Sequence, residues 1–109
     1  MSGPVRLGRI AMAGPKDLKE LDLRIYTAAW CPDCRRLDRW MAERGLAFPK
    51  VDIDTEPGAA ERLEEETGKR AIPFILVKGT RWVRGYHREL PQRLDGDLLV
   101  KELLEAAAS

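Results

Sequence analysis

The spacing of apolar positions divides the chain into seven predicted elements. Apolar residues at every second position predict strands, and apolar residues three or four positions apart predict helices. A short apolar run between turn residues, as in IPFILVKG, predicts a buried strand. In chain order, the predicted elements are a strand over 21–27, a helix over 32–44, a strand over 47–53, a helix over 56–67, a strand within 72–79, a strand over 81–85 and a helix over 95–107.

Residues that favour helix ends stand at the predicted boundaries. Gly45 and Gly68 follow the first and second helices, and glycine readily adopts the left-handed backbone conformation that ends a helix. Thr55 is the expected N-cap of the second helix, and Asp95 or Asp97 is the expected N-cap of the third. The apolar periodicity and the end signals therefore predict the same three helices.

The element order β-α-β-α-β-β-α predicts an α/β fold. Because helices connect the first three strands, we expect those strands to be parallel, with right-handed crossovers. The short turn Lys78–Thr80 makes the fourth strand an antiparallel hairpin partner of the third. A four-stranded mixed sheet with helices on both faces is expected over residues 21–109. Residues 1–20, which contain several glycines and prolines, are expected to form a flexible extension.

Composition and charge narrow the classes of protein to consider. The 109 residues are 44% hydrophobic, which is usual for one globular domain. The formal net charge of +1 provides no field that would attract nucleic acid or an anionic membrane. No apolar run approaches the roughly 20 residues that span a bilayer. We therefore expect neither nucleic-acid nor membrane partners. A monomer is expected as well.

The chain has only two cysteines, and two residues separate them. A secreted domain held together by disulfides would carry more cysteines at wider spacing. The cysteine content therefore favours a reducing compartment, and we expect the cytoplasm.

The two cysteines stand in the segment Trp30-Cys31-Pro32-Asp33-Cys34, where the first strand gives way to the first helix. Unpaired N–H groups and the macrodipole favour negative charge at a helix N-terminus, and the thiolate is the nucleophile in thiol–disulfide exchange. We expect Cys31 to be the exposed attacking sulfur and Cys34, one turn further on, to be the shielded resolving thiol. Pro32 is expected to stiffen the turn, and Trp30 to provide an apolar flank for a docking substrate.

Asp33 lies between the two cysteines in the first helical turn. The helix dipole favours a carboxylate there, whereas the carboxylate charge opposes formation of the Cys31 thiolate. We expect solvent exposure of Asp33 to weaken this opposition, so that the helix N-terminus still stabilises the thiolate.

The Cys-x-x-Cys spacing is also typical of zinc and iron–sulfur sites. A four-ligand zinc site needs two more ligands, and the chain has a single histidine, His87. A cluster shared between two subunits stays open, as does a pair of buried structural cysteines. The alternative to redox catalysis is therefore a module that binds a metal, a cluster or a partner without turnover. In the redox interpretation no residue is a metal ligand.

Three segments resemble the thioredoxin and glutaredoxin superfamily: YTAAWCPDC, LAFPKVDIDTEP and TGKRAIPFILVKG. The resemblance covers residues 21 to about 85 and is greater to glutaredoxins and mycoredoxins than to thioredoxin. It implies the thioredoxin fold in its glutaredoxin-like form. It also implies that the Ile72–Pro73 bond is cis, that Pro73 faces the sulfurs and that the Ile72 backbone binds an extended substrate. Trp30, Pro32 and Asp33 complete the expected substrate-binding surface.

The resemblance further implies a dithiol oxidoreductase that reduces mixed disulfides of proteins or of low-molecular-weight thiols. The expected electron donor is glutathione or an analogous thiol, or a flavin-dependent enzyme similar to thioredoxin reductase, and no bound cofactor is expected. Three stretches depart from the usual glutaredoxin pattern. The first, Thr27-Ala28-Ala29-Trp30, lacks the basic residue that usually stands shortly before the first cysteine. Asp33 stands where a tyrosine is usual, and Arg84-Gly85-Tyr86-His87 replaces a Gly-Gly and acidic segment that holds glutathione.

Overall fold

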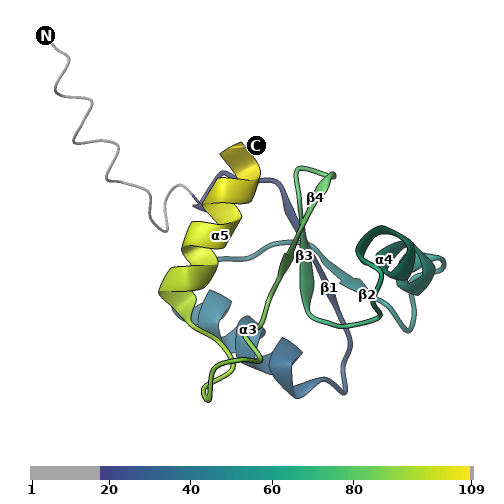
Figure 1. The fold of residues 1–109 in the computed structure, drawn as a ribbon, viewed down its shortest axis with the longest axis horizontal. Helices are drawn as coiled ribbons and strands as arrows, with labels where there is room; N and C mark the ends of the chain where they lie inside the picture. The colour runs from purple at the N-terminus through teal and green to yellow at the C-terminus, as the bar shows by residue number, and fades with distance from the viewer. Residues whose placement is uncertain (1–17, 109) are drawn as a thin grey trace, which may run out of the picture.

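The computed structural model describes residues 18–108 and contains all seven predicted elements in the predicted order (Figure 1). The elements are β1 (Leu23–Thr27), α3 (Pro32–Glu43), β2 (Lys50–Asp52), α4 (Ala59–Thr67), β3 (Phe74–Val77), β4 (Arg81–Arg84) and α5 (Gly96–Ala108). Residues 1–17 lie outside the described residues, so the predicted flexible extension stays a prediction. Leu18, at its end, is fully buried in the core.

The four strands form one mixed sheet in the order β2-β1-β3-β4. β2 is parallel to β1, whereas β3 is antiparallel to β1 and β4 is antiparallel to β3. The predicted mixed sheet and the β3–β4 hairpin are therefore confirmed. The hairpin turn places Lys78 and Gly79 at φ 56° and 72°, which suits the right-handed twist of the two strands.

The prediction that the first three strands are all parallel is wrong for β3. β2 ends at Asp52, which pairs with Thr27, and β3 begins at Phe74, which pairs with Tyr26. The connection between β2 and β3 therefore starts and finishes at the same edge of the sheet. Its helix, α4, has 9 residues, and the chain enters β3 without first returning to the opposite edge.

The C-terminal ends of the first two helices and the N-terminus of the third follow the predicted signals. Gly45 and Gly68 have φ values of 69° and 80°, which confirms them as the residues that end α3 and α4. At the N-terminus of α5, the Asp95 Oδ1 accepts a hydrogen bond from the Leu98 N–H at 3.1 Å. Asp95 is therefore the N-cap of α5, as predicted.

The N-cap predicted for the second helix is wrong. α4 begins at Ala59 after Gly58, and no side chain caps it. The Thr55 N–H instead donates to the Asp52 carbonyl in the turn that follows β2. Local hydrogen bonds to Asp52 therefore hold Thr55 in this turn, and the helix starts four residues later.

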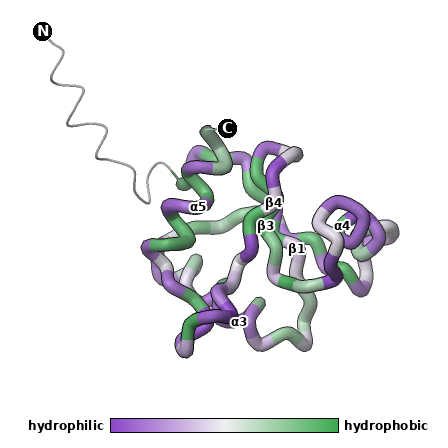
Figure 2. The backbone as a smooth tube through the Cα atoms, in the orientation of Figure 1, coloured by the Kyte–Doolittle hydropathy of each residue, from purple (hydrophilic) through white to green (hydrophobic). Residues whose placement is uncertain are grey.

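Helices cover both faces of the sheet, as predicted, with α3 and α5 on one side and α4 on the other (Figure 1). Successive residues of β1 and β3 point to opposite faces, so each face builds its own apolar core. Figure 2 shows α4 as mostly hydrophilic, and of its residues only Ala59 and Leu63 are buried. The core beneath α3 and α5 contains Leu18, Leu23, Ile25, Leu37, Met41, Leu46, Ile75, Val77, Leu99 and Leu103. The core on the α4 side contains Tyr26, Ala28, Cys31, Cys34, Ala59, Leu63, Ile72, Phe74 and Leu76.

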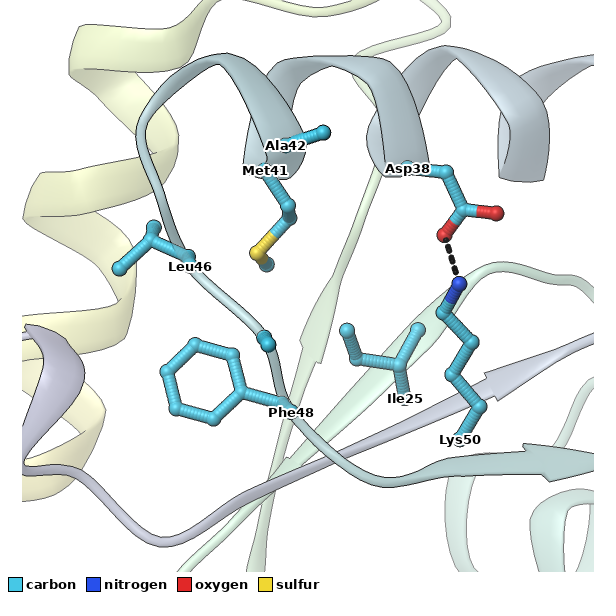
Figure 3. A pocket seen from close by; sticks show the side chains of 8 residues that line it. Ile25, Asp38, Met41, Ala42, Leu46, Phe48 and Lys50 are labelled. Atoms are coloured by element: carbon cyan, nitrogen blue, oxygen red, sulfur yellow. Dashed lines mark ion pairs between the residues drawn. The ribbon is translucent and has the colours of Figure 1, made fainter.

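A cavity of about 260 Å³ lies between α3 and the start of β2 (Figure 3). An ion pair of 2.9 Å between Lys50 and Asp38 borders it. Neither cysteine lines this cavity, so it lies apart from the Cys-x-x-Cys segment. Its lining residues are Ile25, Asp38, Met41, Ala42, Leu46, Ala47, Phe48 and Lys50. Among residues 18–108, no helix combines the length and the apolar character needed to cross a membrane.

Gly96 provides a test of the packing between α3 and α5. A Cβ atom at Gly96 would overlap the Trp40 Nε1 and lie 2.8 Å from its Cε2. We expect Gly96→Ala to lower the free energy of unfolding by roughly 1–3 kcal/mol, as overpacking does. Chemical denaturation measures this change. In a Trp40→Ala background the same substitution should cost much less, because the overlapping indole is gone; an equal cost in both backgrounds would contradict the packing described.

Candidate active site

The Cys-x-x-Cys segment spans the end of β1 and the start of α3. Cys31 is the N-cap of α3, with extended backbone angles of φ −90° and ψ 117°. Pro32 occupies the first helical turn, where its missing N–H has no helical partner to lose. The Cys31 Sγ accepts a hydrogen bond from the Cys34 N–H at 3.1 Å. The sulfur thus replaces the usual capping oxygen and lies at the positive end of the helix dipole.

Both cysteines are free thiols, and both are buried. Cys31 is 4% exposed and Cys34 is 2% exposed, so the prediction of an exposed Cys31 is wrong. The reason is that Cys31 packs in the apolar cluster on the α4 side, together with Ile72. The Cys31 thiol points to the Ile72 carbonyl oxygen at 3.8 Å. The segment that carries Pro73 therefore lies directly against the first sulfur.

The surroundings separate the two thiols chemically. Burial, and secondarily the hydrogen bond with Cys31, raise the pKa of Cys34 to about 12. The Cys34 thiol therefore keeps its proton at neutral pH, while its backbone N–H faces the Cys31 sulfur. The Cys34 N–H and the N-terminus of α3 both direct positive partial charge at the Cys31 sulfur.

The Ile72–Pro73 bond is cis, as predicted. The Pro73 carbonyl accepts a hydrogen bond from the Gly85 N–H at 2.9 Å. A Cβ atom at Gly85 would lie 2.9 Å from the Leu37 Cδ2 and 3.1 Å from the Pro73 Cγ. Gly85 is therefore the residue that lets the end of β4 approach the proline and α3 closely. Within the described part of the chain, the Ile72 N–H has no hydrogen-bond acceptor.

Asp33 differs most from its prediction. Its side chain is only 15% exposed, so the expected solvent exposure is wrong. Arg93 binds both carboxylate oxygens, with Nε 2.9 Å from Oδ1 and Nη2 2.6 Å from Oδ2. Arg36, one helical turn further along α3, contacts Oδ1 as well. The hydrogen bonds from Arg93, more than any other contact, lower the pKa of Asp33, so this carboxylate stays ionised.

Trp30 is the one large apolar side chain in the described chain that is strongly exposed, at 62%. Its Nε1–H donates to the Asp54 Oδ2 at 2.7 Å. This bond holds the indole beside the turn after β2 and leaves most of the ring open to solvent. Next to it, the Arg35 Nη1 donates to the Ala29 carbonyl at 2.9 Å.

His87 is fully buried behind the site and shapes the segment between β4 and α5. Its Nδ1 accepts a hydrogen bond from the Asp95 N–H at 3.1 Å, so the proton lies on Nε2, which faces the Glu102 carboxylate at 2.9 Å. Its backbone N–H donates to the Arg93 carbonyl at 2.6 Å. His87 is therefore a structural residue. Among residues 18–108, no three His, Cys, Asp or Glu side chains lie close enough to hold a metal ion.

The structure thus brings Cys31, Cys34, Ile72 and Pro73 together and places Trp30 at the open side. Sequence reasoning missed Arg93, which stands 60 residues beyond Asp33 in an irregular segment. No local pattern marks such a residue, because only the folded chain brings it to the cysteines.

Comparisons with known proteins agree with this geometry. A family model described as Glutaredoxin matches residues 23–82, more than half of the chain. The Glutaredoxin-like protein NrdH of Salmonella typhimurium is 31% identical over 74 residues, which cover 68% of this chain and 89% of the relative. Glutaredoxin-C4, chloroplastic, of rice is 30% identical over 87 residues, and the chain spans 64% of that relative's length.

A solved structure of a buckwheat glutaredoxin–glutathione complex is similar to the chain with a TM-score of 0.56. The two are 19% identical, and the match covers 93% of this chain and 96% of the other. This likeness concerns the fold alone, and it confirms the predicted glutaredoxin-like form of the thioredoxin fold.

The difference between the two thiols can be measured through ultraviolet absorbance of the thiolate. In Cys31→Ser, the remaining Cys34 thiol should show no thiolate signal below about pH 10, because burial raises its pKa to about 12. Cys34→Ser keeps the sulfur at the helix N-terminus, and an alkylating reagent at neutral pH should modify this sulfur faster than the Cys34 thiol of Cys31→Ser. A neutral-pH signal in Cys31→Ser would contradict the assignment of the two thiols.

Proposed function

Because the chain belongs to the glutaredoxin family, whose members are thiol–disulfide oxidoreductases, we propose that it is a dithiol enzyme with Cys31 as nucleophile and Cys34 as resolving thiol. The hydrogen bond from the Cys34 N–H to the Cys31 Sγ is the observation that supports this most directly. It stabilises negative charge on one sulfur only, and that sulfur begins the helix.

The reaction has two exchange steps. The Cys31 thiolate attacks one sulfur of a substrate disulfide, the S–S bond breaks, and the other substrate sulfur leaves as a thiolate that takes up a proton. Cys34 then loses its proton and attacks the Cys31 sulfur of the mixed disulfide. The second substrate sulfur leaves, and a Cys31–Cys34 disulfide remains. Two electrons have moved from the enzyme dithiol to the substrate.

The proposed docking surface comprises Trp30, Pro32, Asp33, Ile72 and Pro73. The free N–H and the carbonyl of Ile72 lie beside Cys31, which suits an extended substrate backbone. The exposed Trp30 ring provides apolar contact at the other side of the sulfur. Asp33 contributes through the arginines that cover it, because its own oxygens already accept hydrogen bonds.

Glutaredoxins use glutathione-type thiols to reduce disulfide substrates, and the buckwheat relative is described as a glutathione complex. For this chain we propose as the donor either a low-molecular-weight thiol, glutathione or an analogue, or a flavin-dependent reductase. The proposed substrates are mixed disulfides of proteins or of small thiols, the proposed compartment is the cytoplasm, and the proposed state is a monomer without a bound cofactor.

Serine variants of the two cysteines test this function. Cys31→Ser should abolish reduction of a protein disulfide, because it removes the nucleophile. Cys34→Ser should form a stable mixed disulfide through Cys31, because the resolving thiol is missing. Mass spectrometry of the incubated protein detects the adduct and its site. Turnover by Cys31→Ser would exclude this mechanism, and long-wavelength absorbance or stoichiometric metal in the purified protein would support the binding-module alternative instead.

The electron donor can be identified by competition between sources. We expect the oxidised protein to be reduced faster by a low-molecular-weight thiol with its recycling enzyme than by a thioredoxin reductase with NADPH. NADPH consumption measures both rates under one set of conditions. Faster reduction by the thioredoxin reductase would show that the chain uses the flavoenzyme as donor.

A further inference from the structure

The site contains a carboxylate, Asp33, whose negative charge opposes formation of the Cys31 thiolate. Asp33 lies between the two cysteines, one turn or less from each sulfur. A carboxylate in this position opposes the Cys31 thiolate, and the opposition is greater when water does not screen it. With 15% of its side chain exposed, Asp33 has little such screening.

Arg93 offsets the charge of Asp33 with a bidentate ion pair. The guanidinium presents Nε and Nη2 to separate oxygens of the carboxylate, at 2.9 and 2.6 Å. This fork-shaped geometry is specific to arginine, since a lysine ammonium provides only a point charge. Arg93 also interacts electrostatically with Cys31 itself, so its positive charge lies near enough to act on both groups.

The segment that carries Arg93 is held in place by buried hydrogen bonds. The Arg93 carbonyl accepts from the His87 N–H, and the Arg93 N–H donates to the Leu90 carbonyl at 3.0 Å. Arg93 itself has a φ of 61°, a left-handed conformation that non-glycine residues adopt only where their surroundings require it. The imidazole of His87 fixes the far end of the segment through the Asp95 N–H. The backbone is thus bent so that this side chain reaches α3.

Several charged or titratable groups surround Cys31. From α3, they are Asp33, Arg36 and the protonated Cys34. From the segment between β4 and α5 it is Arg93, and Tyr86 in turn lies close enough to Arg93 to interact with it. Arg36 also contacts Asp33 and shares in offsetting its charge, but it reaches Oδ1 only, whereas Arg93 binds both oxygens.

We propose that Arg93 is a positioning residue for the Cys31 nucleophile: it cancels the charge of Asp33 and thereby preserves the thiolate that the helix N-terminus stabilises. This inference rests on the proposed role of Cys31. It also explains how an aspartate can stand inside the Cys-x-x-Cys segment, since the compensating charge comes from the segment between β4 and α5.

Opposite shifts in two single variants test the inference. Arg93→Gln removes the two-oxygen ion pair and leaves Asp33 with Arg36 alone. It should move the pH profile of Cys31 alkylation upward by roughly one pH unit, so that the rate at pH below the midpoint falls roughly tenfold. Asp33→Asn leaves Arg93 uncompensated and should move the profile downward. The double variant should lie close to the unmodified protein, because the two charges are removed together.

Two further variants control the experiment. Arg88→Gln removes the same charge from the same segment without a contact to Asp33, and it should leave the profile unchanged. Arg93→Lys keeps the charge but loses the fork, so it should give an intermediate shift. Denaturant unfolding of each variant shows whether it is folded, and the pH profile is a readout that a purely structural role would not move.

The outcomes separate this inference from the proposed function. If the unmodified protein shows no alkylation of Cys31 near neutral pH, the proposed function is wrong. If Cys31 reacts but Arg93→Gln and Asp33→Asn shift the profile in the same direction, or not at all, the proposed function stands and the role of Arg93 is overturned. Should Arg93→Gln fail to fold, the shifts of Asp33→Asn and Arg93→Lys decide the matter.

Discussion

At the N-terminus of α3, the Cys31 sulfur takes the place that an oxygen occupies in most helix caps. This single hydrogen bond, from the Cys34 N–H, fixes the rotamer of the first cysteine and places the second one turn behind it. The same bond favours negative charge on the first sulfur. The rest of the site is arranged around the Cys31 sulfur, which must accept the hydrogen bond from the Cys34 N–H and also remain within reach of a substrate disulfide.

The fold supplies the surroundings of that sulfur from three separate elements. β1 delivers the chain to the start of α3, and the turn into β3 brings Ile72 and the cis Pro73 against the sulfur. Gly85, at the end of β4, lets the last strand pack on the proline without a clash. The antiparallel direction of β3 is what makes this possible, because it places the start of β3 at the same sheet edge as the end of β1.

Much of the fold and of the site follows from local patterns in the sequence. Alternation and helical periodicity place all seven elements, Gly45 and Gly68 end their helices, and the Cys31–Cys34 pair falls at the strand-to-helix junction. The direction of β3 does not follow, because helical connections alone do not tell which edge of the sheet a chain returns to. The N-cap predicted for α4 is wrong for a related reason. Thr55 has a side chain suited to capping, but its backbone N–H donates to the Asp52 carbonyl in the preceding turn.

Features that depend on distant residues escape local patterns altogether. The burial of Cys31 depends on Ile72, and the environment of Asp33 depends on Arg93. From the sequence alone, a carboxylate between two redox cysteines is expected to be solvated and to have only a small effect on the thiolate. In the folded chain the Asp33 carboxylate is mostly shielded from water, which strengthens its effect on the thiolate. Arg93, from another segment, offsets its charge in an ion pair.

The Asp33–Arg93 pair also links two parts of the molecule that bear on catalysis. The segment between β4 and α5 depends on His87 for its shape, and its arginine depends on Asp33 for its place on α3. Because the Arg93 side chain is 43% exposed, the ion pair by itself contributes little net stability. The ion pair matters because of where it lies. It offsets the charge of Asp33 beside the nucleophile, and it fixes the segment after Gly85 to α3. A substitution of either partner should therefore change both the electrostatics of Cys31 and the surface around it. Through this pair, the chemistry of the Cys-x-x-Cys segment depends on the tertiary fold.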